Sequence, residues 1–281
     1  MICSRRMAGS LLQTADYVIQ TIKDQGIALS LSSRLQVMRM SFLRPDGTPK
    51  IVSPDDPHAN IAREGIRDFQ ILEFALRHLL DIQPPLGQPL MERLRKIVGD
   101  KPLPQDQNDR THGRDAQAEC YVAAVCTKAG MQPRLGEPDI ICGLDGQQWA
   151  LEVKRIKKIA RFQERVKEAI DQIQRVKLPG IVVCDLTVML NEKNEAIFAP
   201  IRDKEFLSLW RASFSRFIRD YGPRLDSWRH GTEVRGMIFL QHYIRLNPET
   251  GWELNTLTNC LNQSHFNQQR DREFLRFAER F

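Results

Sequence analysis

Two apolar segments joined by Asp145-Gly146 constrain the fold of this 281-residue chain more than any other feature. A two-residue hairpin turn needs positive φ at both positions, and Asp-Gly is among the sequences that adopt it best. With these two residues as the loop, Asp139 lies opposite Glu152, and Glu137 lies opposite Lys154. Because strand side chains alternate between two faces, this register decides which residues share a face.

One face of the predicted hairpin is apolar, and it carries Ile140, Cys142, Trp149, Leu151 and Val153. The other face carries Asp139, Glu152 and Lys154. Two carboxylates placed opposite each other on neighbouring strands repel. Lys154 can offset that repulsion, and a divalent cation would do so better. Mg²⁺ is typically held by one or two carboxylates together with water and substrate phosphate.

This combination of charges predicts phosphodiester hydrolysis. A bound divalent ion can polarise a phosphoryl oxygen and supply hydroxide. Lys154, two residues from Glu152 on the same face, can orient the attacking water or stabilise charge in the transition state. The alternative is that Glu152 and Lys154 form an ordinary solvent-exposed ion pair, as an E-x-K sequence on a strand commonly does.

Pro138-Asp139, followed after twelve residues by Glu152-Val153-Lys154, resembles the PD-(D/E)xK nuclease superfamily. That group includes many type II restriction endonucleases and archaeal Holliday-junction resolvases, and the resemblance covers about residues 112–190 by order of elements. It implies an α/β fold with a mixed central sheet flanked by helices, as in a restriction-endonuclease-like core. It further implies that Asp139 and Glu152 bind Mg²⁺, which Mn²⁺ can replace, and that Lys154 assists the nucleophile. The implied activity is that of a metal-dependent DNA endonuclease, and the choice of DNA over RNA rests on the resemblance alone.

In this superfamily a helix precedes the hairpin and often carries an acidic residue at the metal site. Residues 113–130 are similar to that helix. Glu119 lies beside the apolar stripe of the segment, so we expect it to be a further metal ligand. Asp115, one turn earlier, competes with Glu119 for this role, and Glu119 as an ordinary surface residue is the alternative.

A basic segment follows the hairpin, and we expect it to contact the phosphate backbone through Arg155, Lys157, Lys158 and Arg161. The predicted helix over residues 159–176 buries an apolar stripe, which turns the charges outward. Interleaved acidic residues also fit a solvated helix face. Gln163 and Lys167 border the stripe, and we expect them to reach the site.

The chain divides by pattern into two parts. Residues 1–105 predict a helical N-terminal region, and residues 106–281 predict the nuclease-like α/β domain. The N-terminal helices can recognise a target, mediate homodimerisation or cover the core. In the second part we expect residues 228–230, together with Arg224, to lie in a polar surface loop.

A net charge of +6 favours a polyanionic partner. The six cysteines form no C-x-x-C pair and lack zinc-ligand spacing, which predicts reduced thiols in a cytoplasmic protein. No apolar run reaches the roughly 18 residues of a membrane span, so we expect no membrane partner. Two rival functions stay open: a non-catalytic nucleic-acid-binding module with a vestigial nuclease site, and an interaction protein.

Overall fold

The computed structural model describes residues 5–44, 59–82, 86–102, 112–190, 203–247, 251–261 and 268–281. The chain forms two compact units. The first comprises residues 1–124 with 242–255, and the second comprises residues 125–241 with 256–281. The loop near residues 99–113, where the sequence suggests a boundary, lies largely outside the described residues.

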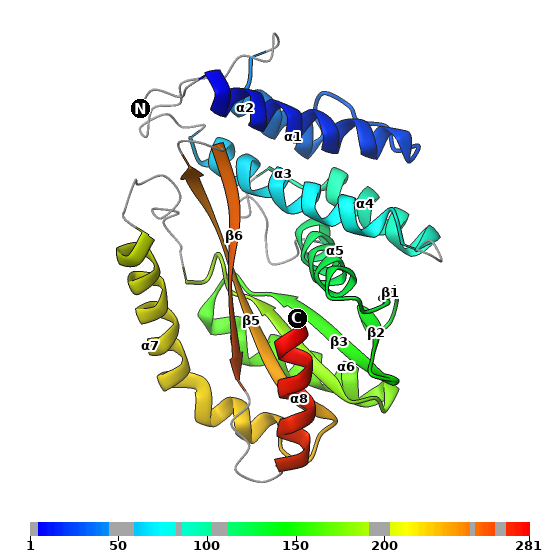
Figure 1. The fold of residues 1–281 in the computed structure, drawn as a ribbon, viewed down its shortest axis with the longest axis vertical. Helices are drawn as coiled ribbons and strands as arrows, with labels where there is room; N and C mark the ends of the chain where they lie inside the picture. The colour runs from blue at the N-terminus through cyan, green and yellow to red at the C-terminus, as the bar shows by residue number, and fades with distance from the viewer. Residues whose placement is uncertain are drawn as a thin grey trace. The chain divides into compact units, whose positions relative to one another are not determined.

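Helices build most of the first unit (Figure 1). They are α1 (Arg5–Asp24), α2 (Arg34–Phe42), α3 (Ala59–Leu79), α4 (Gly87–Gly99) and α5 (His112–Lys128), of which α5 belongs to this unit as far as Ala124. The helical N-terminal region predicted from the 3.6-residue spacing is therefore confirmed. Its apolar stripes are buried, as Val18 and Ile22 of α1 and Leu35 and Met38 of α2 show.

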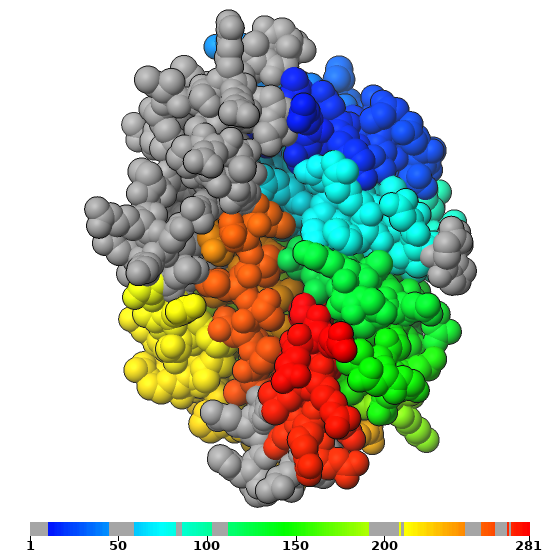
Figure 2. Space-filling model, viewed as in Figure 1, coloured from blue at the N-terminus to red at the C-terminus, as the bar shows by residue number. Residues whose placement is uncertain are grey.

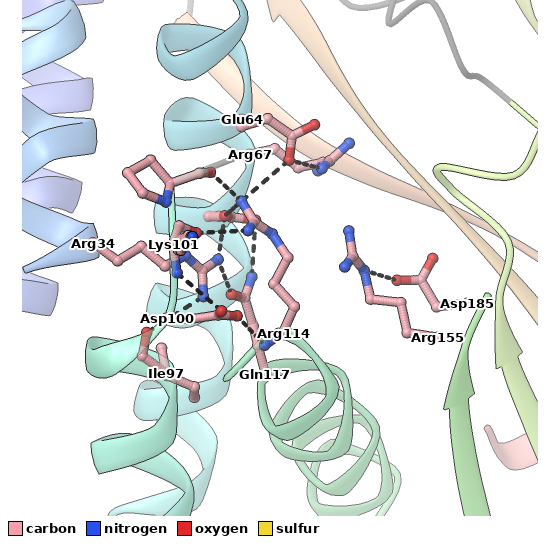
Figure 3. Close-up of polar contacts among 12 residues, drawn as sticks. Arg34, Glu64, Arg67, Ile97, Asp100, Lys101, Arg114, Gln117, Arg155 and Asp185 are labelled. Carbon is pink, nitrogen blue, oxygen red and sulfur yellow. Dashed lines mark hydrogen bonds and ion pairs between the residues drawn. The ribbon is translucent and has the colours of Figure 1, made fainter. Parts of the chain in front are cut away.

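A network of ion pairs is buried among the helices of the first unit (Figure 3). Arg34 of α2 and Arg114 of α5 both donate to Asp68 of α3. Gln117 of α5 donates to Asp68 Oδ1 at 3.1 Å and accepts from Arg34 at 2.6 Å. Burial acts to raise the pKa of Asp68, but the charges of Arg34, Arg114 and Arg67 outweigh it and hold that pKa well below its ordinary range. The carboxylate is thus fully matched by positive charge.

A mixed six-stranded sheet has the strand order β1-β2-β3-β4-β5-β6 (Figure 1). The strands are β1 (Arg134–Leu135), β2 (Ile140–Leu144), β3 (Gln147–Arg155), β4 (Gly180–Asp185), β5 (Val234–Asn247) and β6 (Gly251–Leu261). Strands β1 to β3 pair antiparallel, and β3 to β5 pair parallel. The α/β class with a mixed sheet, predicted from the sequence, is confirmed.

The β2–β3 hairpin has the predicted register. Leu144 pairs with Gln147, and the pairing continues to Ile140 opposite Leu151. The turn residues Asp145 and Gly146 have φ values of 51° and 78°. Both positions thus need the left-handed region that the Asp-Gly sequence accommodates.

Helices cover both faces of the sheet in the second unit. The predicted helix over residues 159–176 is present as η2 (Ile159–Arg161) and α6 (Phe162–Val176), which connect β3 to the parallel strand β4. With α7 (Asp203–Arg229), α6 packs on the face that carries Ala150, Val182 and Phe239. On the opposite face α8 (Gln268–Arg280) sets Phe277 against Trp149, with ring centroids 5.2 Å apart. The outer side of α8 is visible in Figure 2.

The polar loop predicted at residues 228–230 is wrong, because α7 continues through Arg229. Trp228 packs near Phe162, with ring centroids 6.3 Å apart, and the buried Arg229 donates to Asp226. Packing of the aromatic ring against the core therefore outweighs the local polarity of the segment. Across the described residues, no helix combines the length and the apolar character that a membrane crossing requires.

The contact of α8 with β5 leads to a prediction. A Cβ added at Gly236 would lie 2.3 Å from the ring of Phe274. We expect Gly236→Ala to lower the free energy of unfolding by about 1–3 kcal/mol in chemical denaturation, because the ring must shift out of a packed core. Gly143→Ala is the matched control, since its added Cβ meets no atom within 4 Å. Equal effects of the two substitutions would contradict this packing.

Candidate active site

Asp139, Glu152 and Lys154 lie together at the β2–β3 hairpin in the second unit. Lys154 Nζ donates to Glu152 Oε1 at 2.6 Å. The backbone N–H of Asp139 donates to Glu152 Oε2 at 3.3 Å, and the N–H of Val153 donates to Asp139 Oδ2 at 2.8 Å. The hairpin register thus brings both carboxylates and the ammonium into one hydrogen-bonded group.

These charges are withdrawn from solvent. Glu152 is 0% exposed and Lys154 is 6% exposed, whereas Asp139 is partly buried. The alternative of an ordinary exposed ion pair does not fit this burial. Taking charged groups out of water costs free energy unless they are paired and hydrogen-bonded. The burial of these charges therefore indicates a functional role and not an ordinary surface pair.

Electrostatics at the site disfavour two negative charges. Burial, aided by the charge of Glu152, raises the pKa of Asp139 to about 7, although Lys154 acts against this shift. Burial also raises the pKa of Glu152, again opposed by Lys154. The Lys154 ammonium does not outweigh the effect of burial on these two carboxyl groups, and a further positive charge would stabilise their ionised forms.

The donor set fits a hard divalent cation. Nowhere in the described ranges do three or more His, Cys, Asp or Glu side chains form a group that could hold a metal ion. Mg²⁺ needs fewer protein ligands than that, because it keeps several waters and takes further oxygens from substrate phosphate. Asp139 and Glu152 supply two carboxylates held side by side by backbone hydrogen bonds.

Glu119, the other predicted metal ligand, lies on α5 within the first unit. Its Oε2 accepts from Arg93 Nε of α4 at 2.6 Å. Asp115, which competes with it in the sequence, lies in the first turn of α5. The structure therefore describes an ion pair for Glu119, and its role as a metal ligand stays a prediction.

The four predicted nucleic-acid-binding residues lie in different environments. Lys158 and Arg161 are exposed and Lys157 is partly buried. Arg155, by contrast, is buried, with its Nε 3.6 Å from Asp185 Oδ2 (Figure 3). The guanidinium of Arg155 is thus engaged at the ends of β3 and β4, and the exposed positive charge comes from the residues after it.

Gln172 of α6 belongs to the site but was not predicted from the sequence. Its Oε1 accepts from Lys154 Nζ at 2.7 Å. Gln163 is exposed, and Lys167 Nζ lies 5.8 Å from the ring centroid of Trp228.

No local signal in the sequence marks Gln172 as a site residue. It meets Lys154 only because α6 packs beside β3 in the folded chain, so the contact depends on the fold.

No protein-family model, curated protein or solved structure matches this chain. Membership of the PD-(D/E)xK superfamily therefore stays a prediction, and the site has to be interpreted from its own chemistry.

The raised pKa of Asp139 leads to a pH-dependent prediction for the metal-free protein. The pKa is about 7 in the folded protein, against an ordinary value of 3.8. A raised carboxyl pKa contributes stability that is complete below the unfolded value and lost as pH rises through the folded value. We expect Asp139→Asn to exceed the wild type in stability near pH 8 by about 1–3 kcal/mol, with the gap closing toward about pH 4.

The measurement is thermal or chemical unfolding in chelator across this pH range. Asp145→Asn makes the same chemical change in the exposed hairpin turn, where φ of 51° suits asparagine. This control should follow the wild type. Parallel pH profiles for the wild type and Asp139→Asn would contradict the assigned environment of Asp139.

Proposed function

We propose that this chain is a metal-dependent nuclease of the PD-(D/E)xK type that hydrolyses phosphodiester bonds within DNA. The observation that carries the proposal is the buried Glu152–Lys154 pair, 2.6 Å apart, hydrogen-bonded to Asp139 directly before the neighbouring strand β2. Perturbed carboxyl groups that share a buried site with a lysine are characteristic of catalytic centres.

The order of elements supports the same conclusion. Helix α5 precedes the β2–β3 hairpin, α6 follows it, and β4 returns parallel to β3. This is the sequence of elements implied by a restriction-endonuclease-like core. Fold alone does not specify function, so the proposal rests on the side chains of the hairpin and not on this order.

The site residues divide the chemistry between them. Asp139 and Glu152 would hold Mg²⁺, with Mn²⁺ able to replace it. When bound, such an ion polarises a phosphoryl oxygen and lowers the pKa of a water molecule. Lys154 donates a hydrogen bond to the attacking water or to the oxygen that gains charge in the transition state. Burial strengthens this interaction because the local dielectric constant is low.

A vestigial site in a nucleic-acid-binding module is the rival function. Such a site would be expected to have lost its metal ligands or its lysine. Here Asp139, Glu152 and Lys154 are all present and hydrogen-bonded to one another. An interaction protein without a nuclease site leaves the burial of these charges unexplained.

The decisive prediction concerns cleavage. We expect metal-dependent cleavage of DNA in Mg²⁺ or Mn²⁺ and none in EDTA, tested on supercoiled, linear and single-stranded DNA and on RNA. Lys154→Ala and Asp139→Asn should each lower the rate by at least about 100-fold, because each removes charge stabilisation from the reacting centre.

Lys23→Ala removes the same charge from an exposed position of α1 and serves as the matched control for Lys154→Ala. Circular dichroism should show all variants folded. Cleavage that survives in Lys154→Ala, or that is equal in EDTA, would contradict the proposal. Binding of DNA without cleavage under any condition would favour the vestigial module.

A separate prediction concerns binding of DNA by the exposed basic residues. Each phosphate contact by a lysine releases counterions, so affinity falls with salt along a slope set by the number of contacts. In the Lys154→Ala background, we expect Lys158→Ala to lessen that slope by about one. The control is Arg219→Ala, because Arg219 is exposed and already paired with Asp220 at 3.2 Å. Fluorescence anisotropy at several salt concentrations measures both, and identical slopes would remove Lys158 from the interface.

A further inference from the structure

We propose that Gln172 is a positioning residue that holds the Lys154 ammonium in place and leaves one of its N–H groups for a substrate oxygen. The inference rests on the proposed nuclease function and adds a residue that no motif assigns to it. Gln172 lies on α6, eighteen residues beyond Lys154, and reaches the site only through the fold.

The chemistry of its neighbours defines the orientation of the Gln172 amide. Its Oε1 accepts from Lys154 Nζ at 2.7 Å, and its Nε2 donates to Glu137 Oε1 at 3.4 Å. An ammonium can only donate and a carboxylate can only accept, so just one of the two amide orientations satisfies both contacts. Gln172 therefore bridges the strand that carries the lysine and the residue that precedes Pro138-Asp139.

Among the described residues, the hydrogen bonds of Lys154 occupy two of the three N–H groups of its ammonium. An ammonium has three N–H groups, and Glu152 Oε1 and Gln172 Oε1 accept one each. Lys154 is 6% exposed, so its third N–H lies in a nearly closed site. A lysine side chain has a flexible four-carbon stem, and two fixed acceptors restrict the direction of the remaining donor. That donor can then contact the attacking water or a phosphoryl oxygen.

Helix α6 is a rigid support for this contact. Ile173, the next residue, is fully buried and packs directly on β4, where a Cβ at Gly180 would lie 2.2 Å from its side chain. A site on a packed helix holds a side chain more accurately than a site on a loop. Glu137, at the other end of the bridge, is exposed, so the exposed part of the contact is the weaker one.

The test combines DNA cleavage with NMR spectra of the lysine ammonium groups. Gln172→Met keeps the length of the side chain but removes both hydrogen bonds. We expect it to lower kcat by about 10- to 100-fold, because a misplaced catalytic group costs rate, and to leave KM within about twofold. The double variant Glu137→Gln with Gln172→Glu exchanges the two side chains. A carboxylate at position 172 can still accept from Lys154, and an amide at position 137 can donate to that carboxylate. This double variant should recover kcat to within about fivefold of the wild type.

The NMR readout does not depend on catalysis. We expect a slowly exchanging ammonium resonance in the metal-free wild type, assigned by its loss in Lys154→Ala, and we expect Gln172→Met to lose it as well. An unchanged kcat and resonance in Gln172→Met would overturn the proposal, as would a lowered kcat that the exchange of partners does not recover. If the resonance depends on Gln172 but the wild type cleaves no nucleic acid, the contact stands and the nuclease assignment fails.

Discussion

The antiparallel register of β2 with β3 determines where Asp139, Glu152 and Lys154 of the candidate site lie. Leu144 pairs with Gln147 across the Asp145-Gly146 turn, and the next residues along the hairpin join Asp139 to Glu152 by a hydrogen bond. The pleat that buries Trp149 on one side turns Glu152 and Lys154 toward α6 on the other. A slip of one residue would expose the apolar face and separate the charges, so packing and site geometry are a single constraint.

Asp68 and Asp139 show how a structural ion network differs from a candidate site. Asp68 accepts from two guanidinium groups, and its pKa is held well below the ordinary range. Asp139 lies beside the carboxylate of Glu152 and the ammonium of Lys154, and burial together with the charge of Glu152 raises its pKa to about 7. The first arrangement is complete in the folded chain. The second favours the protonated form of its carboxyl groups, and a bound cation would favour their ionised forms.

Much of the fold and of the candidate site was predictable from the sequence because it depends on residues close together in the chain. The Asp145-Gly146 turn, the alternation of Ile140 and Cys142, and the stripe of α6 follow from strand and helix periods. Three features depend instead on distant contacts. Gln172 meets Lys154 only after the chain has crossed from β3 to β4. The polar sequence around Trp228 stays helical because its ring packs near Phe162. The charge of Arg155 is engaged by Asp185, thirty residues later in the chain.

The proposed chemistry depends above all on the binding of a metal ion to Asp139 and Glu152. Titration of the chelator-treated protein with Mn²⁺ in a calorimeter tests it without any assumption about the nucleic acid. We expect saturable binding by the wild type and by Asp145→Asn, and a loss of at least about tenfold in affinity in Asp139→Asn, because a ligand that carries charge becomes neutral. Equal affinity in all three proteins, or no binding by the wild type, would show that Asp139 and Glu152 do not form a metal site.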